Sequence, residues 1–222
     1  MSPQISYLRQ MGVLPPSSMQ NVFIDLIGAG GIGSPTGLTI AKMGFPRMRI
    51  WDDDRVEDRN LPSQMYRLAD IGQYKADALK KLILEFVPMH VNTMISRVSD
   101  KSPALEGIVI SAVDSMTSRR AIWDAAKDNP EVPFYIEARM GLEVLQIFSL
   151  KKPFTPEQIS WYEKNLYSDK KAVDAPCTER AIIYTVMDAA GWIANQLKRY
   201  VRGEEVHSEI TIDLHNQMVM LE

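Results

Sequence analysis

Short apolar runs and segments of helical periodicity alternate along most of this 222-residue chain. Predominantly apolar runs, which are typical of strands buried on both faces of a parallel sheet, occupy residues 22–27, 48–51 and 108–113. Between the runs, apolar residues recur at helical spacing, most clearly in residues 75–86, where they form one face. This alternation predicts an α/β fold with a doubly wound, Rossmann-like sheet that is mainly parallel.

The remaining expected elements continue the alternation of strands and helices and then end in a hairpin. Thr155-Pro156 predicts a helix start, because threonine can cap a helix and proline fits its first turn. A long amphipathic helix then precedes a terminal hairpin, so we expect antiparallel strands at the carboxyl-terminal end of the sheet. The further expected ranges are strands 91–98, 132–138 and 144–150, helices 116–127 and 179–201, and hairpin strands 208–214 and 217–221.

A glycine-rich turn follows the first apolar run. Gly28, Gly30, Gly31 and Gly33 fit the G-x-G-x-x-G pattern with one additional glycine, between an expected strand and an expected helix. Glycine lets the backbone turn tightly and lets phosphate oxygens approach closely. The helix that follows would direct its free N–H groups and the positive end of its dipole at the anion. We therefore predict a nucleotide phosphate site at residues 28–35.

Acidic residues and a lysine lie where this fold would bring them toward the turn. Asp52 and Asp54 end the second strand, 19 and 21 residues after Gly33, and an acidic residue at about this spacing commonly accepts hydrogen bonds from a ribose. Lys75 begins a helix, where a cation opposes the helix dipole unless an anion such as phosphate lies nearby. Asp114 ends the fourth strand, at the edge where open α/β sheets bind ligands. These positions predict one ligand site at that edge.

Composition and charge exclude several classes of protein. A net charge of −3 gives no broad attraction for nucleic acid or acidic lipid, so neither is an expected partner. No apolar run approaches the roughly 18 residues of a membrane span, and the amino terminus lacks a signal-peptide pattern. The single cysteine, Cys177, excludes an internal disulfide and a multi-cysteine zinc site. We expect a cytoplasmic protein with one domain over residues 1–222, of which residues 1–21 form an arm.

Five strings occur in an order that resembles a known family. They are GAGGIGS at 28–34, WDDD at 51–54, NLPSQ at 60–64, GQYK at 72–75 and VDSMTSR at 113–119. Together they resemble the ThiF/MoeB family of adenylyltransferases, which includes the adenylation domain of ubiquitin-activating enzymes. The resemblance covers roughly residues 7–203. It implies ATP, magnesium, and adenylation of the C-terminal glycine carboxylate of a ubiquitin-like or sulfur-carrier protein.

The resemblance also implies roles for individual positions. The glycines would contact the phosphates, Asp54 would hold the ribose, and Asp114 would bind magnesium while Arg119 supports its segment. In the family, an arginine of a short amino-terminal string reaches the partner's ATP across a homodimer, which makes Arg9 the candidate here. The candidate nucleotide-binding residues are Gly28, Gly30, Gly31, Gly33, Asp52, Asp54, Asn60, Gln64, Lys75 and Arg119, and the candidate catalytic residues are Lys75, Asp114, Arg9 and Cys177.

The chain departs from the family pattern in three places. Ser63 stands where the family usually has an arginine directly before the glutamine of the NLPSQ string, and Arg59 or Arg67 is a candidate to supply the missing charge. The Cys-x-x-Cys pairs that bind zinc in many members are absent, so we expect no zinc. Ser115 follows the expected magnesium ligand, where many members have asparagine.

Two interpretations of Cys177 stay open. The residue precedes the expected helix 179–201, and a helix amino terminus can lower the pKa of a thiol from about 8.5. The family often carries a cysteine at the corresponding place, so Cys177 is either a nucleophile that accepts the acyl group as a thioester or a small buried apolar residue. A conjugating enzyme or a sulfur donor would receive the activated carboxylate downstream.

Other functions compete with adenylation of a carrier protein. The glycine pattern alone also fits an NAD-dependent oxidoreductase, although Lys75, Asp114 and the NLPSQ string favour ATP. A non-catalytic family member is the second alternative, and Ser63 is the feature that supports it. The third is adenylation of a peptide or of a modified tRNA base, to which family members have diverged; the net charge of −3 disfavours the tRNA.

Overall fold

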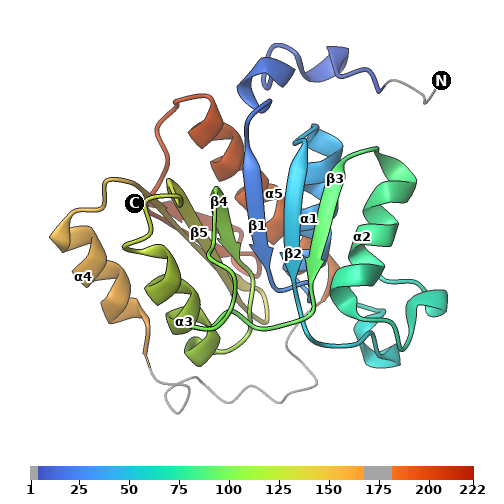
Figure 1. Cartoon of the computed structure of the whole chain (residues 1–222). Coiled ribbons are helices and arrows are strands. Elements are labelled where there is room, and N and C mark those ends of the chain that lie inside the picture. The colour runs from blue at the N-terminus through green and yellow to red at the C-terminus, as the bar shows by residue number, and fades with distance from the viewer. Residues whose placement is uncertain (1–4, 168–181) are drawn as a thin grey trace.

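The computed structural model describes residues 5–167 and 182–222. Within these ranges the chain forms eight strands, five α-helices and four short 3₁₀ turns around one sheet (Figure 1). The strands are β1 (Phe23–Ile27), β2 (Arg47–Trp51), β3 (His90–Met94), β4 (Ile108–Ser111), β5 (Phe134–Gly141), β6 (Val144–Lys151), β7 (Glu209–Asp213) and β8 (Met218–Leu221). The helices are α1 (Gly33–Met43), α2 (Lys75–Phe86), α3 (Met116–Ala126), α4 (Pro156–Asn165) and α5 (Ile183–Val201), and the 3₁₀ turns are Leu8–Gln10, Pro16–Ser18, Asp58–Asn60 and Leu68–Asp70.

The strand order is β3-β2-β1-β4-β5-β6-β7-β8. Strands β1 to β5 pair in parallel, whereas β6, β7 and β8 pair antiparallel to their neighbours. The chain runs outward from β1 to β3 and then returns to place β4 on the other side of β1, so the strand order reverses between β1 and β4. The predicted fold class, mainly parallel with antiparallel strands at the carboxyl-terminal end, is confirmed. A reversal of this kind is where open α/β sheets bind ligands.

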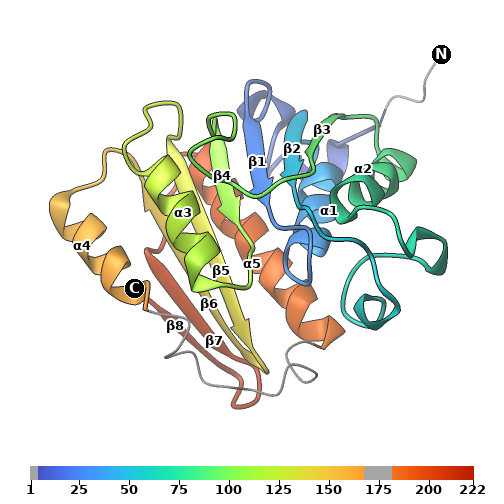
Figure 2. The ribbon, with the colours of Figure 1, turned by 60° about the horizontal axis from the view of Figure 1, so that its bottom comes forward.

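Helices cover both faces of the sheet. Helices α1, α2 and α5 pack in a row on one face, and α3 and α4 cover the other, as the two views in Figures 1 and 2 show. Under α3 and α4 the core is aromatic: the ring of Trp123 lies 5.2 Å from that of Tyr135 and 4.6 Å from that of Tyr162. The central strands are therefore buried on both sides, which explains why they read as continuous apolar runs.

The expected strand boundaries differ from the observed ones where pairing ends. The third strand was expected over 91–98 but ends at Met94, because its neighbour β2 ends at the paired residue Trp51. The fourth strand was expected to reach residue 113 and ends at Ser111. The fifth strand was expected over 132–138, yet β5 continues to Gly141, because β6 pairs with it along that length. Pairing partners that are distant in sequence set these boundaries.

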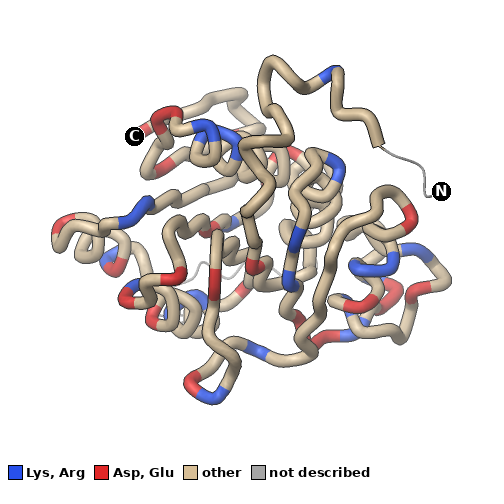
Figure 3. Tube along the Cα trace, turned by 45° about the horizontal axis from the view of Figure 1, so that its top comes forward, with Lys and Arg blue, Asp and Glu red and all other residues tan. Residues whose placement is uncertain are grey.

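Charged positions of both signs are interspersed along the trace (Figure 3). In that view neither sign gathers over one face, which agrees with the small net charge. None of the described helices is long and apolar enough to cross a lipid bilayer.

A buried carboxylate fixes the two central strands to each other. Asp25 on β1 is fully buried and accepts two hydrogen bonds of 2.6 Å from Arg49 on β2. The Trp51 indole donates to it at 2.8 Å, and the backbone N–H of Glu106 donates at 2.9 Å. A buried charge is tolerated when it is paired and hydrogen-bonded in this way.

Asp25→Asn should destabilise the fold by about 3–5 kcal/mol, because removing one charge of a buried pair leaves the other without its partner. Chemical denaturation of the variant and the wild type would measure this difference. A loss below about 1 kcal/mol, the range of an exposed ion pair, would contradict this account of the sheet.

Candidate nucleotide site

The glycine turn connects β1 to α1 at the carboxyl edge of the sheet. Gly28 has a φ of +95°, which side chains rarely adopt, and a β-carbon there would lie 2.5 Å from the carbonyl oxygen of Ala112. A β-carbon at Gly33 would lie 1.9 Å from the carbonyl oxygen of Gly28. At Gly30, by contrast, a β-carbon would meet no described atom within 4 Å. Gly28 and Gly33 are thus required by packing, whereas Gly30 is not, which is compatible with an approach of phosphate to the backbone there.

Two hydrogen bonds attach the acidic end of β2 to this turn. Asp52 accepts a hydrogen bond of 2.7 Å from the backbone N–H of Ala29 through one carboxylate oxygen, and one of 2.8 Å from the N–H of Asp54 through the other. Burial raises the pKa of Asp52, although these two bonds oppose the effect. Both oxygens of Asp52 are therefore occupied by backbone donors, and Asp52 shapes the turn. Of the two ribose candidates, the exposed Asp54 has the more accessible carboxylate.

Lys75 and Asp54 form an ion pair beside the turn. The ammonium group of Lys75 lies 2.8 Å from the Asp54 carboxylate, and the Lys75 backbone N–H donates to the Asp54 carbonyl at 2.9 Å. The Lys75 side chain is only 10% exposed, whereas that of Asp54 is 56% exposed. The two candidates for phosphate and ribose binding thus lie in contact, with the lysine oriented before any nucleotide arrives.

Tyr66 is a site residue that no sequence pattern indicated. Its hydroxyl donates at 2.5 Å to the carbonyl of Ala29 in the glycine turn and contacts the carbonyl of Lys75 at 3.2 Å. Burial raises the pKa of Tyr66 well above its usual value, so the hydroxyl keeps its proton as a donor. Tyr66 therefore fixes the spacing between the glycine turn and the start of α2.

The NLPSQ segment lies next to the glycine turn but supplies fewer free groups than expected. Asn60 accepts a hydrogen bond of 2.8 Å from the N–H of Glu57 and so caps its own 3₁₀ turn. The side-chain oxygen of Gln64 is buried and has no partner among the described residues. The carbonyl of Ser63 lies 3.9 Å from where a β-carbon on Gly31 would be. Gln64 is thus the member of this segment with a buried polar atom left to satisfy.

Neither arginine proposed to compensate for Ser63 is free to do so. Arg67 forms ion pairs with Asp70, at 3.0 Å, and with Glu85 on α2. Arg59 is paired with Glu57 at 2.5 Å, on an exposed side chain. Both guanidinium groups are bound to carboxylates of their own surroundings, so the hypothesis that they supply the missing charge receives no support.

Arg97, which the sequence did not single out, is the arginine that lies among the acidic residues. It donates two hydrogen bonds to Asp53, at 3.1 and 3.2 Å. The hydrogen bond to Asp53 raises the pKa of Arg97, and the carboxylates of Asp53, Asp54 and Asp114 add to this shift. Arg97 thus brings a positive charge to the carboxyl edge from the loop after β3, where no motif marks it.

Asp114 follows β4 at the same edge. Its side chain is exposed, and among the described residues its carboxylate accepts no hydrogen bond and forms no ion pair. Arg119 donates to the backbone carbonyls of Val113 at 2.6 Å and of Asp114 at 3.3 Å. Ser115 caps α3 by accepting a hydrogen bond of 3.1 Å from the N–H of Ser118. The backbone of this segment is thus held firmly while the carboxylate of Asp114 stays available.

The donor set at this edge fits a magnesium ion best at Asp114. Oxygens of Asp52, Asp53 and Asp54 lie within 4.8 Å of one another. Each of these carboxylates already has a partner: Asp52 the N–H of Ala29, Asp53 the guanidinium of Arg97, and Asp54 the ammonium of Lys75. Magnesium prefers carboxylate and phosphate oxygens, and the oxygens of Asp114, which have no partner in the described part of the chain, meet that requirement.

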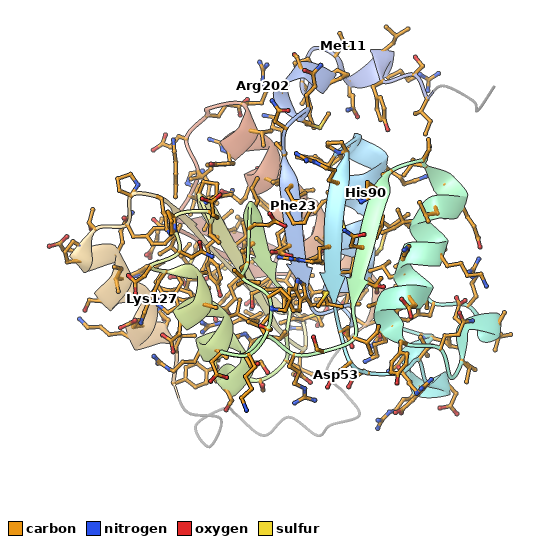
Figure 4. The ribbon with its side chains drawn as sticks, viewed as in Figure 1. Met11, Phe23, Asp53, His90, Lys127 and Arg202 are labelled. Carbon is orange, nitrogen blue, oxygen red and sulfur yellow. The ribbon has the colours of Figure 1, made fainter. Side chains whose placement is uncertain are left out.

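The amino-terminal arm lies at the opposite edge of the sheet. Gln10 donates a hydrogen bond of 2.6 Å to the carbonyl of Met43 at the end of α1, which anchors the arm there. Figure 4 shows Met11 of the arm and Asp53 of the acidic segment at opposite ends of the molecule. Arg9 is exposed on this arm, so it lies away from the glycine turn of its own chain. Cys177, the other outlying candidate, lies outside the described residues.

The glycine turn, the acidic strand end and the reversal of strand order are typical of nucleotide-binding α/β proteins. The sequence model of the ThiF family matches residues 1–219, and the chain belongs to that family. The resemblance inferred from the five strings is therefore confirmed.

Curated relatives are adenylyltransferases and activating enzymes. A NEDD8-activating enzyme E1 catalytic subunit of Arabidopsis thaliana is 33% identical over 106 residues, which are 46% of this chain and 23% of the relative. A probable molybdopterin-synthase adenylyltransferase of Porphyra purpurea is 34% identical over 116 residues, 49% of this chain and 30% of the relative. The matched part is less than a third of either protein.

Solved structures share the fold over most of the chain. The microcin C7 biosynthetic enzyme MccB in complex with N-formylated MccA has a TM-score of 0.75 at 17% identity, over 93% of this chain and 66% of that chain. PaaA has a TM-score of 0.72 at 19% identity, over 93% of this chain and 74% of that chain. A structure of E. coli MccB with ATP has a TM-score of 0.72 at 17% identity, over 93% and 65%. At these identities the likeness concerns the fold.

Gly33→Ala and Gly30→Ala form a matched pair of alanine variants of the turn. Gly33→Ala should lose on the order of 3 kcal/mol of stability, because its β-carbon would collide with a backbone carbonyl. Gly30→Ala should stay within about 0.5 kcal/mol of the wild type, because its β-carbon points into open space.

The same pair reports on ligand binding through thermal shift with ATP and magnesium. ATP at about 100 times its dissociation constant stabilises a protein by about 2.7 kcal/mol, and Gly30→Ala should lose most of that gain. A Gly30→Ala protein that is stabilised as strongly as the wild type would contradict a phosphate site at this turn.

Proposed function

We propose that the chain catalyses ATP-dependent adenylation of a C-terminal carboxylate, with magnesium as the metal. The observation that carries the proposal is the assembly at one edge of the sheet of an open glycine turn, an oriented lysine and the Asp114 carboxylate, which has no partner among residues 5–167 and 182–222. The names of the relatives support the reaction class, since they include adenylyltransferases and an E1 catalytic subunit.

The residues of this chain would act by positioning and by stabilising charge. The carboxylate of the substrate attacks the α-phosphate of ATP, an acyl adenylate forms, and pyrophosphate leaves. Backbone N–H groups of the glycine turn and the amino terminus of α1 would bind phosphate oxygens, and Asp54 would accept hydrogen bonds from the ribose. Lys75 would exchange its contact with Asp54 for a phosphate oxygen. Asp114 would hold the magnesium ion, which would supply positive charge to offset the negative charge developing on the phosphates.

We propose a ubiquitin-like or sulfur-carrier protein ending in glycine as the substrate. Support comes from the relatives named for NEDD8 activation and for molybdopterin synthase. In this proposal Cys177 accepts the acyl group from the adenylate: the thiolate attacks the acyl carbon, AMP leaves, and a thioester forms. A conjugating enzyme or a sulfur donor then receives the acyl group. Intact mass spectrometry after incubation with ATP, magnesium and candidate glycine-tailed proteins or peptides would identify the substrate and any adduct.

Lys75→Ala should lower ATP–pyrophosphate exchange by about 100-fold or more, since removing one charge-stabilising donor typically costs about 2.7–4 kcal/mol of transition-state stabilisation. Lys81→Ala is the matched control, because Lys81 is an exposed lysine on the same helix, and it should exchange at the wild-type rate. A loss below tenfold for Lys75→Ala would count against its role. Thermal stabilisation of the wild type by NADH and none by ATP would favour an oxidoreductase.

Arg9 provides a test of the proposed homodimer. The arm that carries it lies at the edge of the sheet opposite its own glycine turn, so its proposed contact is with the ATP of a second copy. Arg9→Ala and Lys75→Ala should each be inactive alone. Mixed in equal amounts, they should recover about one quarter of the wild-type rate, since half of randomly exchanged two-fold dimers contain one intact site. Absence of recovery in a mixture shown to exchange subunits would contradict the contact between copies.

A further inference from the structure

A second buried carboxylate lies beneath the carboxyl edge of the sheet. Glu137 on β5 is 0% exposed, and its oxygens meet donors from three different elements. The Nε of Arg119 on α3 lies 2.9 Å from its Oε1, as an ion pair without hydrogen-bond geometry. Arg139 donates to both oxygens, through Nε to Oε1 and through Nη2 to Oε2 at 3.1 Å, and the hydroxyl of Tyr162 donates to Oε2.

Arg119 connects Glu137 to the backbone carbonyls of Val113 and of Asp114, the candidate metal ligand. It is 6% exposed, and while one part of its guanidinium faces Glu137, its Nη2 donates to the Val113 carbonyl at 2.6 Å and its Nη1 to the Asp114 carbonyl at 3.3 Å. A guanidinium is planar and its donors keep a fixed geometry. The orientation that Glu137 imposes on one part of the group therefore fixes the donors that hold residues 113 and 114.

Glu137 also orients Arg139, which likewise binds a backbone carbonyl of another segment. Arg139 is 7% exposed and donates from Nη1 to the carbonyl of Asn165, the last residue of α4, at 2.8 Å. Glu137 thus lies between two guanidinium groups, each of which holds main-chain carbonyls of another segment. Burying a charge cluster is seldom an efficient way to gain stability, since apolar residues of the same volume often serve as well. In this protein the cluster of Glu137 with its two arginines instead determines the position of the segment after β4 and of the end of α4.

We propose that Glu137 is a positioning residue for the adenylation site. It acts through Arg119 to hold the backbone carbonyls of residues 113 and 114, and this keeps the carboxylate of Asp114 directed at the site. The inference rests on the proposed function for its catalytic consequence. The effect of Glu137 on the backbone can be measured without nucleotide. That measurement therefore tests the positioning of the segment separately from the proposed adenylation activity.

Hydrogen–deuterium exchange of the full chain tests the backbone effect. Glu137→Gln should accelerate exchange of the amides of residues 113–118 by at least about tenfold, since these amides open more readily once Arg119 loses its anchor. Asp25→Asn is the matched control, because it also neutralises a fully buried carboxylate paired with an arginine. In the control, the amides of residues 113–118 should exchange no faster than those of the rest of the sheet. Equal acceleration in both variants, or none in Glu137→Gln, would overturn the proposal.

Arg119→Lys is the second variant, and it tests the same step if Glu137→Gln does not fold. A lysine keeps the charge opposite Glu137 but lacks the forked donors that reach two carbonyls. It should therefore accelerate the same amides as Glu137→Gln while shifting the melting temperature less. Exchange at the wild-type rate in Arg119→Lys would contradict transmission through the guanidinium.

Pyrophosphate exchange tests the catalytic consequence. Glu137→Gln should lower kcat by about tenfold and raise the magnesium concentration for half-maximal rate, with a change in the KM for ATP below about threefold. A variant whose kcat and magnesium dependence match those of Asp25→Asn would reduce Glu137 to a structural role. If the wild type exchanges no pyrophosphate with any carboxylate substrate, the proposed function fails, and the deuterium measurement still decides whether Glu137 positions the segment.

Discussion

The candidate site depends on the close approach of Gly33 to the carbonyl of Gly28. A β-carbon at Gly33 would lie 1.9 Å from that oxygen, so the chain can leave β1 and begin α1 this abruptly only with glycine at both positions. The turn directs the amino terminus of α1 across the carboxyl edge of the sheet. Asp52 and Tyr66 are placed relative to that turn, since each forms a hydrogen bond with Ala29.

Two buried carboxylates organise the opposite sides of the strand-order reversal. Asp25 joins β1 to β2 through Arg49, and Glu137 on β5 joins the segment after β4 to α4 through two arginines. Both are fully buried, and both direct guanidinium groups whose remaining donors reach backbone carbonyls. Electrostatic interactions in the core thus hold backbone carbonyls of neighbouring chain segments, while the exposed charges at the edge, Asp54 and Asp114, remain accessible to a ligand.

The sequence predicted the parts of this site that depend on local pattern. The glycine turn, the acidic end of β2 and the start of α2 at Lys75 were located from spacing alone, because a strand, a turn and a helix within a short stretch determine one another. Arg97, Tyr66 and Glu137 were missed, because each acts on a segment far away in the chain and none carries a motif. The ion pair of Arg67 with Glu85 could not be predicted for the same reason, because Glu85 lies 18 residues away on α2. The boundary of β3 likewise depended on where β2 ends.

A crystal structure with a non-hydrolysable ATP analogue and magnesium tests the central claim most directly. We predict phosphates on the backbone of residues 28–33, the ammonium group of Lys75 turned from Asp54 to a phosphate oxygen, and the metal bound to Asp114. A triphosphate bound elsewhere, or a glycine turn filled by the side chains of the protein itself, would contradict it.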